Sequence, residues 1–219
     1  MMGKAQLTLS SKNYGAWSLR GWLMVKMSGL EFEEKVIPPD DPTMRADILL
    51  MSSSIRVPRL THGDVDVWDT LAIGEYLHEQ YPQRGLLPAD SAARAHCRSV
   101  CGEMHSGFAT LRNALPVNIK AHFPGYKVWS KAKEDIQRIC EIWDDCLNRY
   151  GGPFLFGASP GVADAMFAPV VTRFRTYDVQ LPDHLNRYCQ RMLDLPWMLE
   201  WVQDAKAEPD EIDELDAEF

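Results

Sequence analysis

The stretch at residues 56–70, RVPRLTHGDVDVWDT, decides the fold class. Two short apolar runs, VPRLTH and DVDVW, flank the turn residues HGD and predict a β-hairpin. After the second run the apolar residues change to helical spacing, so DTLAIGEYLHEQY predicts a helix that begins near Asp69. A proline, Pro58, stands at the start of the first run and removes one hydrogen-bond donor there. This stretch therefore predicts a strand, a strand and a helix in succession.

The residues before this stretch predict two further pairs of a strand and a helix. AQLTLS alternates with a period of two, and WSLRGWLMVKMSG has helical spacing and ends at Gly29. EFEEKVI predicts a second strand, and Asp41 and Pro42 predict the start of a second helix. The predicted order over residues 1–81 is βαβαββα, which fits a thioredoxin-like domain best.

Beyond residue 81 the pattern is helical throughout. PQRGLLPAD at residues 82–90 predicts a linker, and an acidic tail is expected at 208–219. An all-helical domain is expected between them, at 91–207, with helices at 91–123, 128–150, 162–174, 183–192 and 196–207. Pro116 is expected to kink the first of these helices or to end its regular hydrogen bonding. The second is expected to bury one face, made of Trp129, Ala132, Ile136, Ile139, Cys140, Trp143 and Leu147.

Composition limits the class of protein. The chain has 219 residues, of which 46% are hydrophobic, so it can bury a sizeable core. No run approaches the roughly 18 apolar residues of a membrane span, and the first residues lack a signal core. Seven of the acids behind the net charge of −8 lie in the tail EPDEIDELDAEF, and no basic stripe is present. We therefore expect a cytoplasmic protein without a membrane or nucleic-acid partner.

The five cysteines indicate reduced, buried thiols. All of them lie at position 97 or later, and none forms a CxxC motif. Cys97 and Cys101 share a helix face, where they are expected to pack rather than to bind a metal. We therefore expect no metal site.

Pro58 and the start of the third helix together predict a site for a peptide-like anion. A cis Val57–Pro58 bond would leave the amide and carbonyl of Val57 free to pair with a ligand backbone. The free amides at the helix start favour an anion, so Thr70 would hold a carboxylate, although Asp69 and Thr70 also suit capping of their own helix. Arg56 lies beside this path and either holds a second carboxylate or is a surface arginine without a partner. A peptide-like ligand with a carboxylate at each end is glutathione.

These motifs resemble those of the cytosolic glutathione S-transferase family. VPRL followed by WDTLAIGEYL is similar to the family's Val-Pro-x-Leu and acid-Ser/Thr-x-Ala-Ile-x-x-Tyr-Leu signature, and FLFGASPGVADAMFAPVVTRF resembles its second signature. The resemblance covers residues 5–205. It implies a thioredoxin-like domain followed by an all-helical domain, a homodimer, and a role in detoxification with glutathione as cosubstrate. Gly161 stands where the family usually has Ser or Thr, and Asp164 is expected to reach back to the start of its helix.

The segment SSKNYGAWSLRGW, between the first strand and the first helix, is expected to activate the thiol. It resembles the zeta-class pattern Ser-Ser-Cys-Ser-Trp and the related tau and omega patterns; with Trp17 at the tryptophan, Asn13 and Tyr14 match the two serines and Gly15 the cysteine. Nucleophilic cysteine chemistry is thereby excluded. Lowering a thiol pKa by two units from about 8.5 needs roughly 2.7 kcal/mol. Tyr14 and Asn13 are the preferred donors, and Trp17 is expected to wall the site. The alternatives are Ser11, Ser18 and a backbone amide.

The acceptor site is expected between the two halves, along GEMHSGFATLRNALP, with Met104, Phe108, Arg112 and Asn113 as its lining residues. His105 is either an acid-base group or a histidine that serves only the interface. Three functions stay open. The first is a transferase that adds the glutathione thiolate to a small hydrophobic electrophile, the second a zeta-like glutathione-dependent cis-trans isomerase, and the third a non-catalytic glutathione-binding module. The sequence identifies neither the electrophile nor the pathway.

Overall fold

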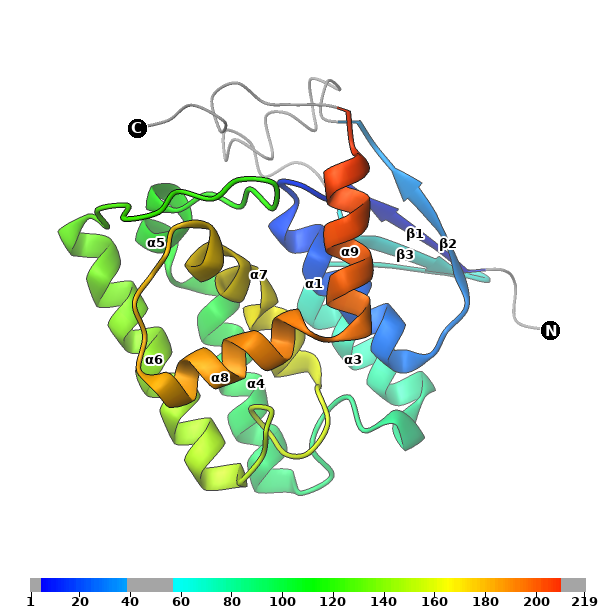
Figure 1. Ribbon diagram of the computed structural model, residues 1–219. Coiled ribbons are helices and arrows are strands. Elements are labelled where there is room, and N and C mark those ends of the chain that lie inside the picture. The colour runs from blue at the N-terminus through cyan, green and yellow to red at the C-terminus, as the bar shows by residue number, and fades with distance from the viewer. Residues whose placement is uncertain (1–4, 39–56, 210–219) are drawn as a thin grey trace.

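The first half of the protein is built on one mixed four-stranded sheet. The structure is a computed structural model that describes residues 5–38 and 57–209, so the predicted helix at Asp41 and the predicted ligand residue Arg56 lie outside the described residues. The strand order is β2-β1-β3-β4; β1 runs parallel to β2 and antiparallel to β3 (Figure 1). The strands are β1 (Ala5–Leu9), β2 (Phe32–Val36), β3 (Arg59–His62) and β4 (Val65–Trp68). The hairpin at 59–68 and its place beside β1 agree with the prediction.

Two helices of this half, α1 (Ala16–Ser28) and α3 (Thr70–Gln80), pack against each other beside the sheet. The alternation in β1 places Leu7 and Leu9 in the core, where each is fully buried. As predicted, α1 ends at Gly29, whose φ of +73° places it in the left-handed region that favours glycine. The sheet and these two helices therefore share one hydrophobic core, which includes Leu23 and Leu77.

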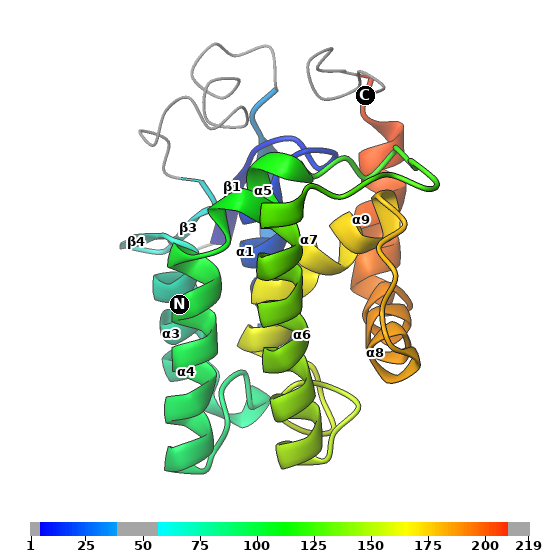
Figure 2. The same ribbon diagram turned by 90° about the vertical axis from the view of Figure 1, so that its left-hand side faces the viewer.

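The second half consists of helices around α7. They are α4 (Ser91–Ser106), α5 (Ala109–Ala114), α6 (Ser130–Tyr150), α7 (Val162–Thr176), α8 (Asp183–Leu193) and α9 (Pro196–Ala207), and a short 3₁₀ helix, η1 (Pro82–Arg84), precedes them. Nearly every residue of α7 is buried, because α7 packs against α1 on one side and against α4 and α8 on others (Figure 2). The contact between α1 and α7 joins the two halves.

The predicted long helix at 91–123 is wrong. The helix breaks after α4, where Gly107 is extended and Phe108 has a φ of +58°, and it resumes as the short α5. The prediction that regular hydrogen bonding ends at Pro116 is confirmed, since α5 stops at Ala114. Trp129 is a second correction: it precedes α6 instead of lying on its buried face, and its exposed fraction is 69%.

Asp164 closes the start of α7 as predicted. Its Oδ2 accepts a hydrogen bond from the Gly161 amide at 2.9 Å, and its Oδ1 accepts from the Leu155 amide and the Tyr188 hydroxyl at 3.1 Å. Burial outweighs these donors and raises the pKa of Asp164 to about 6. The structure also explains Gly161, because a Cβ there would lie 2.8 Å from the carbonyl oxygen of Leu86.

The five cysteines are all free thiols, and four of them are buried. The residues that the structure describes include no group of three His, Cys, Asp or Glu side chains able to hold a metal ion. None of the described helices is both long and apolar enough to cross a bilayer.

Candidate functional site

The predicted ligand strand lies against α1. The Val57–Pro58 peptide bond is cis, Val57 is half-buried, and Pro58 is buried. Gly21 of α1 makes this approach possible, since a Cβ at that position would lie 2.5 Å from Cγ of Pro58. β3 begins two residues after Val57 and pairs with β1 and β4.

The start of α3 contains a side-chain cap and a polar group without a partner. Asp69, with a φ of +73°, accepts hydrogen bonds through Oδ1 from the amides of Leu71 at 2.8 Å and Ala72 at 3.4 Å. Asp69 thus caps the helix. The hydroxyl of Thr70 is buried and has no hydrogen-bond partner among the described residues. Buried hydroxyl groups usually have a hydrogen-bond partner, and the free amides at a helix start favour an anion, so this position is chemically suited to a carboxylate.

His105 connects this helix start to the rest of the site. Its Nε2 lies 2.5 Å from Oδ2 of Asp69, and its ring lies 5.1 Å from that of Trp17. His105 is in the last turn of α4, so the pair joins α4, α3 and α1 at one point. The sequence left two roles open for His105, and in the structure its ring lies at the interface between α4, α3 and α1.

The loop before α1 places Asn13 and Tyr14 inside the protein. Asn13 is fully buried; its carbonyl oxygen accepts from the Ile119 amide at 3.2 Å, and its Oδ1 accepts from the Lys120 amide at 2.9 Å. Its Nδ2 has no partner in the described part of the chain. Tyr14 has an exposed fraction of 4%. Asn13 therefore has one fixed acceptor and one unused donor.

Gly15, which the sequence matches to the cysteine of the zeta-class pattern, has no room for a side chain. A Cβ there would lie 2.3 Å from the Ser11 carbonyl oxygen and 2.4 Å from Oγ of Ser10. The alternative donors are already engaged: the hydroxyls of Ser18 and Ser10 pair at 2.9 Å, and the Ser11 hydroxyl donates to Glu208 at 2.6 Å. The packing of the loop therefore requires glycine at position 15.

Two arginines lie over the ring of Trp17, and the charge of a third, Arg173, acts on one of them. The guanidinium carbon of Arg20 lies 4.3 Å from the Trp17 ring centre, and that of Arg112 lies 5.7 Å from it. Arg20 is fully buried and donates from Nε to the carbonyl of Met166, but neither Nη atom has a partner among the described residues. Burial, with the nearby charges of Arg173 and Arg112, holds the pKa of Arg20 well below its usual value. Burial also lowers the pKa of Arg173 to about 9.

The predicted acceptor residues fall into different environments. Met104 is fully buried in the core, Phe108 is buried at the break after α4, and Asn113 is exposed. Arg112 is half-buried beside Trp17. Arg20 and Arg173 are not among the predicted site residues, although each is a cation within an apolar helical run, and this pattern is the signal that could have identified them.

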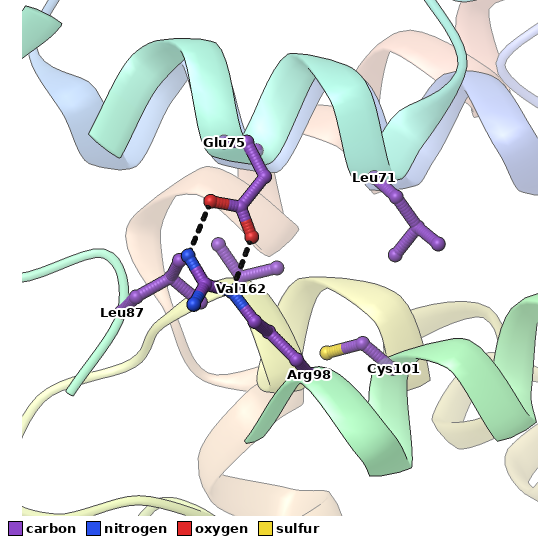
Figure 3. Close-up of a pocket in the computed structure, with 7 residues that line it drawn as sticks. Leu71, Glu75, Leu87, Arg98, Cys101 and Val162 are labelled. Carbon is purple, nitrogen blue, oxygen red and sulfur yellow. Dashed lines mark hydrogen bonds and ion pairs between the residues drawn. The ribbon is translucent and has the colours of Figure 1, made fainter. Parts of the chain in front are cut away.

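A pocket of about 230 Å³ lies elsewhere, between α3 and α4 (Figure 3). Glu75 and Arg98 cross it with two hydrogen bonds of 2.7 Å, and Cys101 and Leu71 contribute to its wall. Its lining includes none of the predicted glutathione or thiol residues.

Comparison with known proteins places these features in one family. Residues 9–85 match the model of the glutathione S-transferase N-terminal domain, and residues 89–204 match that of its C-terminal domain. The chain is 29% identical to glutathione S-transferase 1 of Dianthus caryophyllus over 77% of this chain and 76% of that protein. It is 22% identical to a probable maleylacetoacetate isomerase of Caenorhabditis elegans over 83% of this chain and 85% of that protein.

Solved structures confirm the predicted fold class. Maleylacetoacetate isomerase from Anaeromyxobacter dehalogenans, with bound GSH in the active site, superposes with a TM-score of 0.70 at 23% identity, covering 95% of this chain and 98% of that one. A glutathione transferase homologue from Burkholderia, with bound glutathione, gives a TM-score of 0.68 at 24% identity over 94% of this chain and 100% of that one.

Proposed function

Because this chain belongs to the glutathione S-transferase family, we propose that it binds glutathione, stabilises the thiolate and adds it to a small electrophile. The observation that carries the proposal is the buried, unpartnered hydroxyl of Thr70 at the start of α3. A carboxylate of glutathione accepts a hydrogen bond from this hydroxyl and lies at the positive end of the helix. The backbone of the tripeptide pairs with the amide and carbonyl of Val57, and Arg56 holds the second carboxylate.

The thiol of glutathione lies at the start of α1 in this arrangement. Asn13 offers its Nδ2 donor, which has no partner among the described residues, and Tyr14 is the second candidate donor; their loop leads into the start of α1, which no side chain caps. A donor to sulfur stabilises the thiolate more than the thiol and so lowers the thiol pKa. Gly15 supplies no nucleophile, so the reaction uses the glutathione sulfur alone. Trp17 forms one wall of the site.

A second candidate, the cis-trans isomerase, is favoured by the arginines around Trp17. In that reaction the thiolate adds to an activated carbon–carbon double bond, and the electron pair moves to the conjugated carbonyl oxygen. Rotation about the resulting single bond and expulsion of the thiolate complete the isomerisation. The substrate would carry carboxylates, which Arg112 and the positive potential of Arg20 and Arg173 suit. Several relatives carry the name maleylacetoacetate isomerase.

The remaining features of the proposal are supported by the sequence pattern and by the family. We propose domain limits of 1–81 and 91–207 with a linker at 82–90, a homodimer, and a cytoplasmic role in detoxification. The acceptor is held near Phe108 and Arg112, with Met104 and Asn113 as the other proposed contributors.

The proposal is tested by titrating the chain with glutathione and comparing Thr70→Val with wild type. Removing the hydroxyl donor to a desolvated carboxylate should weaken binding by about 30-fold, which corresponds to about 2 kcal/mol. The free protein should keep its stability, because the lost hydroxyl has no hydrogen-bond partner among residues 5–38 and 57–209. Thr61→Val, in the hairpin, is the matched control and should bind normally. Equal affinities for wild type and Thr70→Val would contradict the proposed pose.

The three candidate functions are separated by the ultraviolet absorbance of the bound thiolate as a function of pH. An enzyme should ionise bound glutathione well below its solution pKa, whereas a non-catalytic module should leave that pKa unchanged. Asn13→Ala and Tyr14→Phe identify the donor, because only removal of the true donor returns the pKa toward its solution value. Transfer to an aryl halide, assayed beside isomerisation of an unsaturated dicarboxylate, then separates conjugation from isomerisation.

A further inference from the structure

The carboxylate of Glu208 joins the end of the helical half to the loop before α1. Its Oε2 accepts hydrogen bonds from the hydroxyl of Ser11 at 2.6 Å and the amide of Asn13 at 3.1 Å. Its Oε1 accepts from the amide of Lys12 at 2.6 Å. Three consecutive loop residues thus donate to one side chain that lies 195 to 197 positions further along the chain.

Glu208 is held in this place by its surroundings. Its carbonyl oxygen accepts from Nζ of Lys120 at 2.5 Å, and its amide donates to the last turn of α9. The same helix reaches the loop twice more: Trp201 donates from Nε1 to the carbonyl of Lys12 at 2.9 Å, and Asp204 pairs with Nζ of Lys12 at 2.6 Å. The loop is therefore fixed by α9 and by the residue that follows it.

These contacts fix the direction of one donor. Glu208 holds the main chain at Asn13, and the Lys120 amide holds Oδ1 of the same side chain. With both ends held, the unpartnered Nδ2 of Asn13 keeps one direction instead of rotating with the loop. We propose that Glu208 is a positioning residue, which holds the Asn13 donor in place for the glutathione thiolate. This inference rests on the proposed function, since it assigns a role within the same site.

The direction in which the pKa of the bound thiol changes when Glu208 is replaced distinguishes loss of positioning from loss of the negative charge. Glu208 is itself negative, so its charge opposes a nearby thiolate, and removing that charge alone would lower the thiol pKa. The facing charged groups are Lys120, which binds the Glu208 carbonyl, and Lys12, which is paired with both Asp204 and Glu34. Loss of positioning acts in the opposite direction, because a misdirected donor no longer stabilises the thiolate. A rise in the thiol pKa therefore reports the position of the loop.

The test compares Glu208→Ala and Glu208→Asp with wild type in the full chain, using the thiolate absorbance of bound glutathione. In Glu208→Ala the pKa of the bound thiol should rise by about one unit, and kcat at neutral pH should fall about tenfold. The dissociation constant of glutathione should change less than about threefold, because Val57 and Thr70 are untouched. Glu208→Asp keeps the charge but shortens the side chain, so it should show a smaller rise and also covers the case in which the alanine variant fails to fold.

Glu200→Ala is the matched control. Glu200 is another acid of α9, and it pairs with Lys26 instead of the loop, so its removal should leave the thiol pKa unchanged. An unchanged or lowered pKa in both Glu208 variants, with glutathione still bound, would overturn the positioning role alone. Failure of wild type to bind glutathione would overturn the proposed function as well, and the two failures are therefore distinguishable.

Discussion

The starts of α3 and α1 serve the two ends of the proposed glutathione site, but they are closed in different ways. At α3, Asp69 caps the amides two and three positions ahead of it, so the closure is local. At α1, Gly15 is the capping residue and has no side chain to offer. The loop before it is held by Glu208 and by Lys120, which lies 107 positions from its partner Asn13.

This difference predicts that the two ends respond differently to changes in the helical half. At the carboxylate end, Asp69 caps its own helix, and the helical half reaches it through the exposed contact with His105 of α4. The thiol end depends on contacts from α9 and from the segment after α5, and these form only when both halves are assembled. Thiol activation should therefore be lost before glutathione binding when the helical half is perturbed.

The largest expected effect is the pH dependence of stability at a third helix start, that of α7. There Asp164 accepts a hydrogen bond from the amide of Gly161, and its carboxyl group is buried in the core. Burial raises the pKa of Asp164 from 3.8 to about 6, so the folded state binds its proton more tightly than the unfolded state does. The stability that this group contributes is complete below about pH 4. It is lost as the pH rises through 6, and the full change is about 3 kcal/mol.

Urea unfolding of wild type and Asp164→Asn between about pH 4 and 7 tests this prediction. The asparagine cannot ionise, so the stability of wild type relative to the variant should fall as the pH rises. The other groups titrate alike in both proteins, so their contribution cancels when the free energy of unfolding of the variant is subtracted from that of wild type at each pH. Parallel stability curves across this range would contradict it and would show that the three donors to Asp164 fully offset its burial.

The next effect tests the start of α1. Gly15→Ala places a methyl group against the Ser11 carbonyl and the Ser10 hydroxyl, both well within contact distance. The free energy of unfolding should fall by about 2 kcal/mol, because a packed loop must shift. Gly102→Ala in α4 is the control, since nothing lies within 4 Å of its new Cβ and the helix should gain up to about 1 kcal/mol. If Gly15→Ala unfolds at the same urea concentration as wild type, the loop is less fixed than its contacts indicate.

The same contrast explains how much the sequence predicted. The hairpin, the helix at Asp69 and the back-reaching Asp164 depend on neighbours within about ten residues, so periodicity and capping patterns reveal them. The closure of the thiol loop depends on Glu208, which the sequence presents only as the first acid of an acidic tail. Long-range partners of this kind leave no local pattern. The break at Phe108 was missed for a related reason: tertiary packing overrides a continuous helical pattern there.

Arg20 shows how far the site could be predicted from the sequence. Its place in an apolar helical run marks it as buried and unusual, but only the folded chain brings it to Trp17 together with Arg112, which lies ninety-two positions away in the sequence. Burial of an arginine without a carboxylate partner is costly. Such a group is retained most readily where an anion completes it, and this supports the proposal of an acidic acceptor.

The smallest expected effect returns to the start of α3 and separates the cap from the ion pair. Asp69→Asn keeps a side-chain acceptor for the Leu71 amide and tolerates the positive φ, but it removes the charge that faces His105. Both side chains of the pair are a third or more exposed, so its loss should cost less than about 1 kcal/mol. Asp69→Ala loses the cap and also strains the backbone, so it should cost about 1 to 2 kcal/mol more. Equal losses in the two variants, measured by urea unfolding, would place the stabilisation in the contact with His105 instead of the cap, and α3 would then depend on the helical half as α1 does.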